Sequence, residues 1–599
     1  MDPAQQQQQA YGQAPYAQHA AAGQYGADPH AQYYAQQQPP QHAGQYAQGG
    51  YAQPQQQPQP QPQQAGYGYQ TQPAPQPAAA MAAAPAQDYT SQIDDAEAVD
   101  GVRFVWNEWP LNKVEQERAV FKLGALYTPL KASNGSTHVV PYEPIRCKNQ
   151  ACGGVLNPYA AVDYGGKSWG CPFCGTRNAF PPSYSSIAPD HRPTELMYTT
   201  MEYQLNKYFG PPVFLFVVDT AVPDDEELDG LKDSLQQCLS ILPESAMVGL
   251  ITFGANVQVH ELGFQQQAQS QTVCSKAYVF RGEKAVAPER IFQMLGMGRP
   301  TNPAQPGAQP TAMQQQHLPP GVERFLAPVK PVAAALDQII DDLRRDPWPT
   351  MRDLRPQRCT GVALSVAVTM LEKMCAKRGA RIMMFMSGPP TVGEGAIAEE
   401  KLEVALRSHT DIEKGRATLY KAAKAYYEAL SARCVENCHA VDMFVCSLDQ
   451  TGLLEMKSCV ELTGGCVVLA DSFGQSVFKE SFRRMFTRHP PTAHDADKDQ
   501  LVMGLAATLE LVLSADIKIK GAIGPCASLN KKGPTVSDAE VGQGGTFAWR
   551  MCAMDATSTL AFYFDVRFFL GGGFSRGFRA GLSNEEANAK TPKSFVRVK

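Results

Sequence analysis

Long hydrophobic runs and a secretory leader are both missing from this chain of 599 residues. No apolar stretch reaches the roughly 18 residues that identify a membrane-spanning helix. The N-terminus also lacks the basic start and apolar core of a signal peptide. We therefore expect a protein of the cytoplasm. Its length predicts several domains, because single hydrophobic cores stop growing at about 250–300 residues.

A strong positive charge and the common catalytic motifs are missing as well. Lys and Arg number 53 against 58 Asp and Glu, so the net charge is −5. This balance disfavours a strongly basic nucleic-acid-binding protein. The chain has no G-x4-G-K-[ST] phosphate loop, no G-x-S-x-G elbow and no H-E-x-x-H helix. Gly393 and Gly395 form only a fragment of a dinucleotide fingerprint, without its third glycine. We predict that the chain is not an enzyme.

Lys and Arg are absent before Arg103. Residues 1–95 consist mainly of Gln, Ala, Pro, Tyr and Gly without a hydrophobic period, so we predict a disordered arm. Its tyrosines among glutamines resemble a prion-like segment, and self-association or scaffold recruitment and a solubilising tail both remain open as its role. Residues 567–599 hold seven Lys and Arg and two Glu. They also lack a period and are predicted to form an unstructured basic tail.

Cysteine, in contrast, is abundant, with 15 residues. Most cysteines stand singly inside apolar patterns, such as Cys238, Cys446 and Cys552. This pattern indicates buried, reduced thiols and not a secreted disulfide framework.

Four cysteines form a different pattern within residues 141–190. Cys147 and Cys152 are spaced C-x4-C, eighteen residues follow, and Cys171 and Cys174 are spaced C-x2-C. Two close pairs on tight turns with glycine nearby can hold one Zn²⁺ by four thiolates. Because four protein ligands leave no open coordination position, we predict a structural zinc finger and not a catalytic site. Four unrelated cysteines are the alternative.

The middle of the chain, residues 205–488, alternates buried strands with amphipathic helices. Residues 213–218 form a continuous apolar run that Asp219 ends, and Met247–Phe253 is a second run. Between them leucines recur on one helix face, at Leu228, Leu231, Leu235, Leu239 and Leu242. This strand–helix–strand unit predicts a parallel sheet with a right-handed crossover. Its repetition predicts a doubly wound α/β trunk.

The same alternation continues through the trunk. Further helices are predicted over 334–343, Thr360–Met374, 411–433, 452–462 and 475–486, and further strands over 381–388, 441–448 and 466–473. Residues 265–271 and 298–321 are predicted to be surface insertions.

Residues 96–140 and 500–566 carry short apolar segments that alternate in period two and are divided by Gly or Pro. We predict that strands within residues 103–131 pair with strands within residues 501–566. The result would be an antiparallel β sandwich built from both ends of the chain.

Three features near the predicted strands have ordinary structural explanations. The acidic run of residues 224–227 stands at a helix start, where exposed N–H groups favour carboxylates. His260 and His439 are lone histidines beside apolar strands, so a surface role or a core role with satisfied hydrogen bonds is expected, and not catalysis.

Several strings in this order resemble the Sec-twenty-three family, the inner-layer subunits of the COPII vesicle coat. They are VWNEWP, LYTPLK, RGEK after YVF, RRDPWP at 344–349, TGVALSVAV at 360–368, LDQTGLLEMK at 448–457, DSFGQSVFK, and GAIGPCASLN at 521–530. The C-x4-C half of the cysteine pattern is also similar to this family, whereas the sister Sec-twenty-four subunit has C-x2-C.

This resemblance implies a coat protein that promotes vesicle formation for transport from the endoplasmic reticulum to the Golgi. Such subunits pair with a Sec-twenty-four-family cargo adaptor, bind the Sar GTPase, help bend the membrane and meet the outer COPII coat subunits. The implied location is the cytoplasmic side of the endoplasmic reticulum and of coated vesicles, with peripheral membrane contact and no nucleic acid. The zinc finger would carry one structural zinc ion.

The family's trunk is similar to a von Willebrand A domain, which often carries a D-x-S-x-S metal site after its first strand. The corresponding residues here are Asp219, Ala221 and Pro223. Because both hydroxyl ligands are missing, we expect no metal ion in the trunk.

The resemblance runs from about Gly101 to Val566 and implies a C-terminally incomplete member. The family continues into a helical domain and a gelsolin-like domain, whose arginine finger accelerates GTP hydrolysis, typically by about 10³–10⁵. No matching segment is recognised after Val566. We therefore expect this chain to bind the GTPase through its trunk and to activate it weakly or not at all.

A second hypothesis is a zinc-ribbon interaction or RNA-binding protein that uses the Gln/Tyr-rich arm. Basic residues near the cysteines favour it, namely Arg146, Lys148, Lys167 and Arg177. The negative net charge and the lack of an aromatic and basic stripe count against it.

Overall fold

The computed structural model describes residues 100–106, 109–110, 112–131, 138–205, 210–262, 276–297, 321–489 and 500–566. The predicted arm, the predicted tail and the insertion at 265–271 lie outside these residues, as does nearly all of the insertion at 298–321. Within the described part of the chain, no helix is both long and apolar enough to cross a bilayer.

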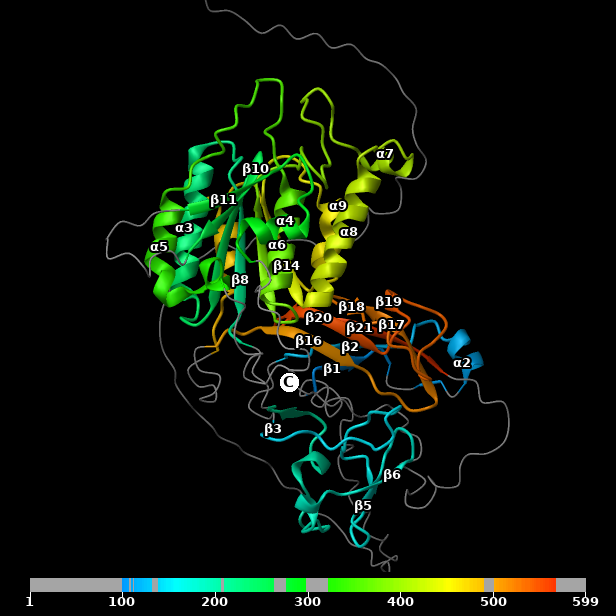
Figure 1. Ribbon diagram of the computed structural model, residues 1–599. Helices are drawn as coiled ribbons and strands as arrows, with labels where there is room; N and C mark the ends of the chain where they lie inside the picture. Colours follow the sequence, from blue (N-terminus) through cyan, green and yellow to red (C-terminus); the bar gives the residue numbers. More distant parts are fainter. Residues whose placement is uncertain are drawn as a thin grey trace, which may run out of the picture. The chain divides into compact units, whose positions relative to one another are not determined.

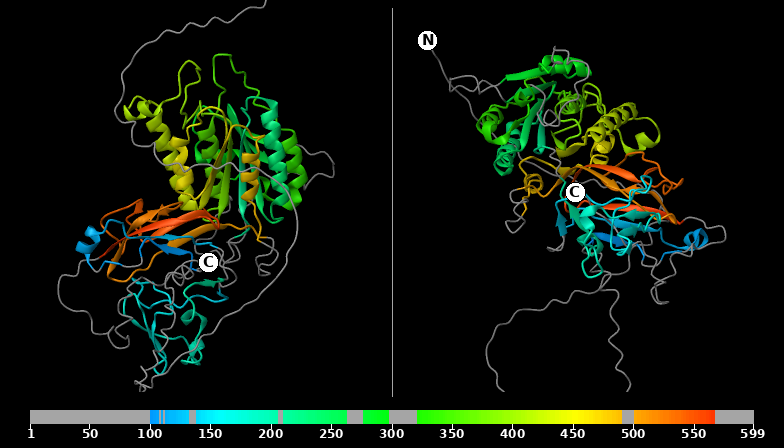
Figure 2. Two further views of the ribbon diagram at one scale, coloured as in Figure 1. Left: turned by 180° about the vertical axis from the view of Figure 1, so that it is seen from behind. Right: turned by 60° about the horizontal axis from the view of Figure 1, so that its bottom comes forward.

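The trunk is built on one eight-stranded sheet (Figures 1 and 2). Its strands are β8 (Val213–Asp219), β9 (Met247–Phe253), β10 (Asn256–Glu261), β11 (Lys276–Arg281), β12 (Ala327–Pro328), β13 (Ala380–Met386), β14 (His439–Cys446) and β15 (Val467–Ala470). The order is β11-β10-β9-β8-β13-β14-β15, with β12 beside β9. Strands β8, β9, β13, β14 and β15 are parallel, and β10, β11 and β12 are antiparallel additions. Without the edge strand β11 and the short β12, the strands β10-β9-β8-β13-β14-β15 follow the 3-2-1-4-5-6 order of a doubly wound sheet, although β10 is antiparallel. The predicted trunk fold is therefore confirmed.

Helices cover both faces of this sheet (Figure 1). One face packs against α3 (Asp225–Ile241), α5 (Val329–Asp341) and α10 (Ser476–Arg484), and the other against α4 (Pro288–Met294), α6 (Thr360–Met374), α8 (Tyr420–Asn437) and α9 (Leu453–Glu461). Strand β8 is fully buried because its alternate residues pack into the hydrophobic cores on the two faces of the sheet. Phe214 and Phe216 face the α3 side, and Leu215 and Val217 face the α6 side. This explains why the strand reads as a continuous apolar run.

The single helix predicted over 411–433 is wrong. The chain forms α7 (His409–Glu413) and then, after a break, α8 (Tyr420–Asn437). Ser408 caps α7 in a capping box with Asp411, and Gly415 then takes a left-handed φ of 68°. A left-handed residue ends a helix, so the hydrophobic pattern spans two helices.

The two ends of the described chain form one β sandwich (Figure 2). One sheet has the order β1-β2-β21-β17-β19, and the other has the order β16-β20-β18. The strands are β1 (Val102–Phe104), β2 (Gly124–Tyr127), β16 (Gly504–Glu510), β17 (Ile517–Ile523), β18 (Ala527–Ser528), β19 (Gln543–Gly544), β20 (Ala548–Met554) and β21 (Leu560–Val566). Gly124 lies opposite Tyr563, and Tyr127 lies opposite Leu560, in an antiparallel pair. The predicted pairing of the chain ends is therefore confirmed.

The sequence analysis missed one element of this sandwich, α2 (Lys113–Arg118). Asn112 caps the helix by accepting from the Glu115 N–H, but none of its residues is buried. The helix therefore has no apolar period to detect. Its Gln116 side chain donates to the Phe564 carbonyl at 3.2 Å and accepts from the Val566 N–H at 2.9 Å. This helix thus binds the end of β21.

Candidate metal centre

A small module between residues 141 and 205 carries the predicted metal ligands. Its antiparallel sheet consists of β4 (Ala161–Asp163), β5 (Ser168–Gly170) and β6 (Arg177–Ala179). A parallel pair of β3 (His138–Val140) and β7 (Met201–Tyr203) accompanies it. The buried core around the sheet is small and includes Leu156, Trp169 and Phe180. A core of this size is too small for a stable fold without an added cross-link.

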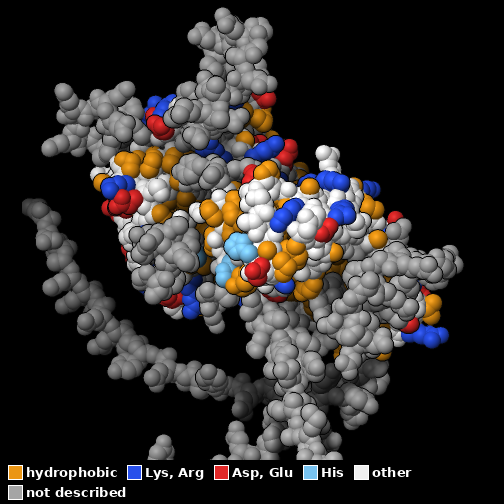
Figure 3. Space-filling model, turned by 90° about the horizontal axis from the view of Figure 1, so that it is seen from below, with side chains coloured by type: hydrophobic (Ala, Val, Ile, Leu, Met, Phe, Trp, Pro, Cys, Tyr) orange, Lys and Arg blue, Asp and Glu red, His pale blue; other side chains and the backbone are white. Residues whose placement is uncertain are grey.

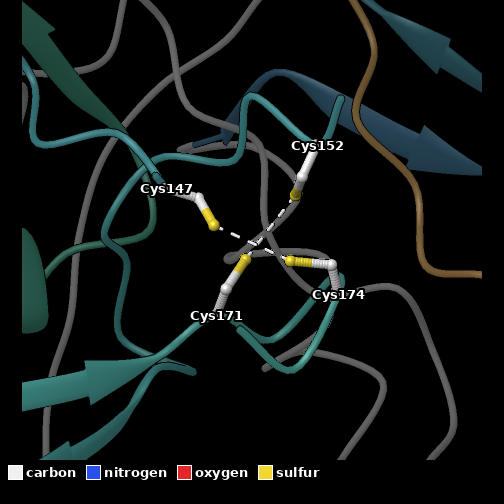
Figure 4. Close-up of side chains that lie close together, drawn as sticks. All are labelled: Cys147, Cys152, Cys171 and Cys174. Carbon is white, nitrogen blue, oxygen red and sulfur yellow. Dashed lines mark hydrogen bonds between the residues drawn. The ribbon is translucent and has the colours of Figure 1, made fainter. Parts of the chain in front are cut away.

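The structure brings the four predicted cysteines together (Figure 4). Their ligand atoms all lie within 4.8 Å of one another. The sulfurs of Cys147 and Cys174 are 3.7 Å apart, as are those of Cys152 and Cys171. Four sulfurs placed tetrahedrally at about 2.3 Å from one zinc ion lie about 3.8 Å apart. The observed spacing fits a zinc ion, and it is far too long for disulfides at about 2.05 Å.

Each pair of cysteines lies on a turn that ends in a glycine, as predicted. In the second turn the Cys171 N–H donates to the Thr176 carbonyl at 3.0 Å. Gly153 and Gly175, which directly follow the second cysteine of each pair, have left-handed φ values of 64° and 70°. Glycine adopts this conformation without steric cost. The two turns therefore end in the same left-handed glycine conformation, although the spacings of their cysteines differ.

Asn178 connects the two cysteine turns and was missed by the sequence analysis. Its carboxamide oxygen accepts from the Lys148 N–H at 2.9 Å, and its amide nitrogen donates to the Thr176 carbonyl at 2.9 Å. It is buried on β6. A polar residue four positions after the last cysteine was the available signal, but the sequence does not show that it faces inwards.

The metal-free thiols have unequal acidity. Burial raises the pKa of Cys171 and of Cys152. Burial also opposes ionisation of Cys174, but hydrogen bonds with the side chain and backbone of Thr176 and with the thiols of Cys152 and Cys147 outweigh it and lower its pKa to about 6. A zinc ion needs thiolates, and the pKa of Cys174 is lowered whereas those of Cys152 and Cys171 are raised. The donor set and the sulfur geometry thus fit a four-thiolate zinc site held by Cys147, Cys152, Cys171 and Cys174.

Comparison with known families assigns this module, the trunk and the β sandwich to one family. Three family models match consecutive parts of the chain: the Sec23/Sec24 zinc finger at residues 144–184, the Sec23/Sec24 trunk domain at residues 210–489, and the Sec23/Sec24 beta-sandwich domain at residues 504–596. This chain carries three domains of the Sec23/Sec24 family. The last match extends well past Val566, so the resemblance continues further than the sequence analysis predicts.

The chain is also similar to solved structures, one of which supports the fold. The human COPII-coat protein Sec24c is similar with a TM-score of 0.53 and 17% identity, over 79% of this chain and 57% of Sec24c. The chain thus spans little more than half the length of that protein. A von Willebrand factor type A structure from Catenulispora acidiphila gives a TM-score of 0.30 and 11% identity, over 60% of this chain and 59% of that one.

Three other positions that the sequence analysis considers lie in the Sec23/Sec24 trunk. Asp224 caps α3 by accepting from the Glu227 N–H at 2.9 Å, so the acidic run serves the helix start. The carboxylate of Asp219 meets the guanidinium of Arg358. The fragment at 393–395 forms left-handed turns, where a side chain on Gly393 would collide with the Gly282 carbonyl.

Both lone histidines of the trunk lie in its interior. His260 Nε2 is 2.9 Å from the Thr252 hydroxyl, and His439 Nε2 is 3.2 Å from the Cys375 carbonyl. Both are therefore core histidines and not surface ones, but the expected satisfied hydrogen bonding is incomplete, because each Nδ1 atom is buried without a hydrogen-bond partner among the described residues. Burial lowers the pKa of each imidazole from 6.5 to about 4.

These two histidines predict a loss of stability in mild acid. The unfolded chain binds protons at each histidine below about pH 6.5, whereas the folded chain does so only near pH 4. Stability that is complete above pH 6.5 is therefore lost as the pH falls towards 4. We expect a cost on the order of 1–2 kcal/mol per histidine at pH 5, measured by urea unfolding.

The matched variants are His439→Gln and His409→Gln. The first should remove the share of the pH dependence between 6.5 and 4 that comes from His439, about half of the total, and leave the share of His260. The second replaces a histidine whose side chain is 81% exposed and serves as the surface control. An unchanged slope in His439→Gln would contradict the prediction.

Proposed function

We propose that this chain is a COPII coat component of the Sec-twenty-three type, which promotes vesicle formation from the endoplasmic reticulum. The observation that carries the proposal is the ordered match of zinc finger, trunk and beta-sandwich models. The similarity to a human COPII-coat protein supports the same fold. The spacing of Cys147 and Cys152, C-x4-C, favours the Sec-twenty-three type over its Sec-twenty-four sister.

In this proposal the four cysteines hold one structural zinc ion, and the chain acts by binding. Its partners are a Sec-twenty-four-family cargo adaptor, the Sar GTPase and the outer coat subunits. The chemistry of GTP hydrolysis belongs to the Sar GTPase. The place of action is the cytoplasmic side of the endoplasmic reticulum membrane and of coated vesicles, with peripheral contact.

Pairing with the sister subunit is the direct test. We expect the chain, co-expressed with a Sec-twenty-four-type subunit, to co-elute with it from a size-exclusion column. Co-expression with a Sec-twenty-three-type subunit is the matched control and should give no complex. Flotation with liposomes that carry GTP-locked Sar then tests recruitment. If the chain pairs only with the Sec-twenty-three-type subunit, the assignment of type is wrong; if it pairs with neither and does not float, the proposed function is wrong.

RNA binding by the zinc finger is the weaker candidate. The Arg177 guanidinium is already paired with Asp163, and the Lys167 ammonium donates to the Ile187 carbonyl at 2.7 Å. On the face shown in Figure 3, Lys and Arg side chains lie in several separate places among acidic and hydrophobic ones. Filter binding to RNA at two salt concentrations should therefore show no strongly salt-dependent affinity.

A further inference from the structure

A buried positive charge lies at the carboxyl edge of the trunk sheet. Asp219 is the last residue of β8 and has a fully buried side chain. Arg358 is 3% exposed, and its Nε lies 2.6 Å from the Asp219 carboxylate. This edge, between β8 and β13, is where the strand order of the doubly wound sheet reverses. Open α/β sheets bind their ligands at this switch point.

Further oxygens surround the same guanidinium. Nη2 of Arg358 donates to the Ala221 carbonyl at 2.6 Å and to the Ser387 hydroxyl at 3.2 Å, and Nη1 donates to the Pro389 carbonyl at 3.1 Å. The Ser387 hydroxyl itself donates to the Asp219 carboxylate at 2.8 Å. One carboxylate, one hydroxyl and two carbonyls from two loops thus face one cation.

The loop after β13 is shaped around this side chain. A Cβ atom on Gly388 would lie 2.5 Å from Nη1 of Arg358, so any other residue here would push the guanidinium out of its present position. The Arg358 N–H donates to the Thr391 hydroxyl at 2.9 Å, and the Thr391 N–H donates to the Arg358 carbonyl at 3.0 Å. The position of the Arg358 side chain is therefore fixed by backbone and side-chain contacts together, and not by the ion pair alone.

The surrounding atoms are those of a metal site, but the position does not fit a metal ion. Carboxylate, hydroxyl and carbonyl oxygens are the ligands of hard cations such as Ca²⁺. In this chain the guanidinium fills the space among them, and it neutralises the only carboxylate among these acceptors. A second cation next to it would be repelled.

We propose that Arg358 is an internal counter-ion that takes the place of an exchangeable cation in the trunk. The loops around residues 219–223 and 387–391 are held by a charge that belongs to the chain and cannot dissociate. It follows that a variant without this side chain has a latent site for a small, oxygen-seeking cation. Asp219 and Arg358 both lie within the trunk, so the effect of this ion pair can be measured without any coat partner.

Calcium rescue of Arg358→Ala tests the proposal. Loss of the guanidinium leaves Asp219 buried without a counter-charge, so hydrogen exchange at residues 387–398 should rise on the order of a hundredfold. Millimolar Ca²⁺ should restore much of this protection in Arg358→Ala and change nothing in the wild-type chain. Calcium is added and no chelator is used, because a chelator would also attack the zinc finger.

Arg381→Ala is the matched control. Arg381 is also buried and paired, through two hydrogen bonds to the Asp442 carboxylate, but among the residues that the structure describes no other side chain accepts from its guanidinium. Its removal should loosen the trunk without any response to Ca²⁺. Equal calcium responses in both variants, or none in Arg358→Ala, would overturn the proposal.

A second pair of variants avoids the large cavity that Arg358→Ala would leave. Arg358→Lys keeps a cation at the site, whereas Arg358→Met keeps similar length without charge. A cation site predicts at least tenfold slower exchange at residues 387–398 in the Lys variant than in the Met variant. If the Met variant is protected as well as or better than the Lys variant, Arg358 acts by packing and the proposal is wrong.

Discussion

Cys171→Ser is expected to abolish zinc binding and to unfold the zinc finger while the trunk stays folded. Zinc contributes about 10–16 kcal/mol of apparent binding free energy to such small modules. The hydrophobic core of this one is small, and cannot replace that contribution. Zinc content per chain, measured by plasma mass spectrometry, should fall from one to near zero. Hydrogen exchange should rise throughout residues 141–190.

The control for this experiment is Cys446→Ala, which removes a buried thiol from β14 of the trunk. That variant should keep its zinc and the exchange pattern of the zinc finger. The outcome against the prediction is a Cys171→Ser chain that still holds one zinc ion, or a wild-type chain that holds none. Either result would mean that the cluster at 3.7 Å sulfur spacing is not the metal centre.

The features that the sequence predicts well are those with strong local signals. Residues 213–218 and Met247–Phe253 are buried on both faces, so their apolar runs are continuous and their strands are clear. The four cysteines are recognisable because a metal site requires pairs with short spacing. The pairing of the chain ends is also predicted, since both ends carry period-two segments that need a partner sheet.

The features that the sequence does not predict depend on contacts between distant residues. The Arg358 side chain meets Asp219 across 139 positions of the chain, and neither residue is unusual in its own segment. Asn178 likewise connects the two cysteine turns only because its side chain points into the module, which the sequence does not show. The helix α2 is exposed and has no apolar face to detect. The break before α8 depends on one glycine conformation inside an otherwise helical pattern.

Asp442→Ala is expected to be the most damaging single change in the trunk. Asp442 lies on β14 and accepts from Nε and Nη2 of Arg381 on β13, at 2.8 and 2.6 Å. It also accepts from the Cys466 N–H at 3.0 Å. Both charged side chains are buried, so removal of one leaves the other without a counter-charge. The apparent free energy of unfolding in urea should fall by about 3–5 kcal/mol.

The double variant Arg381→Met with Asp442→Leu distinguishes an unpaired charge from a lost contact. A buried ion pair gains little over apolar side chains of similar size, because both ions lose their hydration. The double variant should therefore recover most of the stability that Asp442→Ala loses, with an unchanged denaturant slope. If it is as unstable as Asp442→Ala, the pair stabilises the sheet by specific geometry, and the desolvated Arg381 charge is not the cause of the loss.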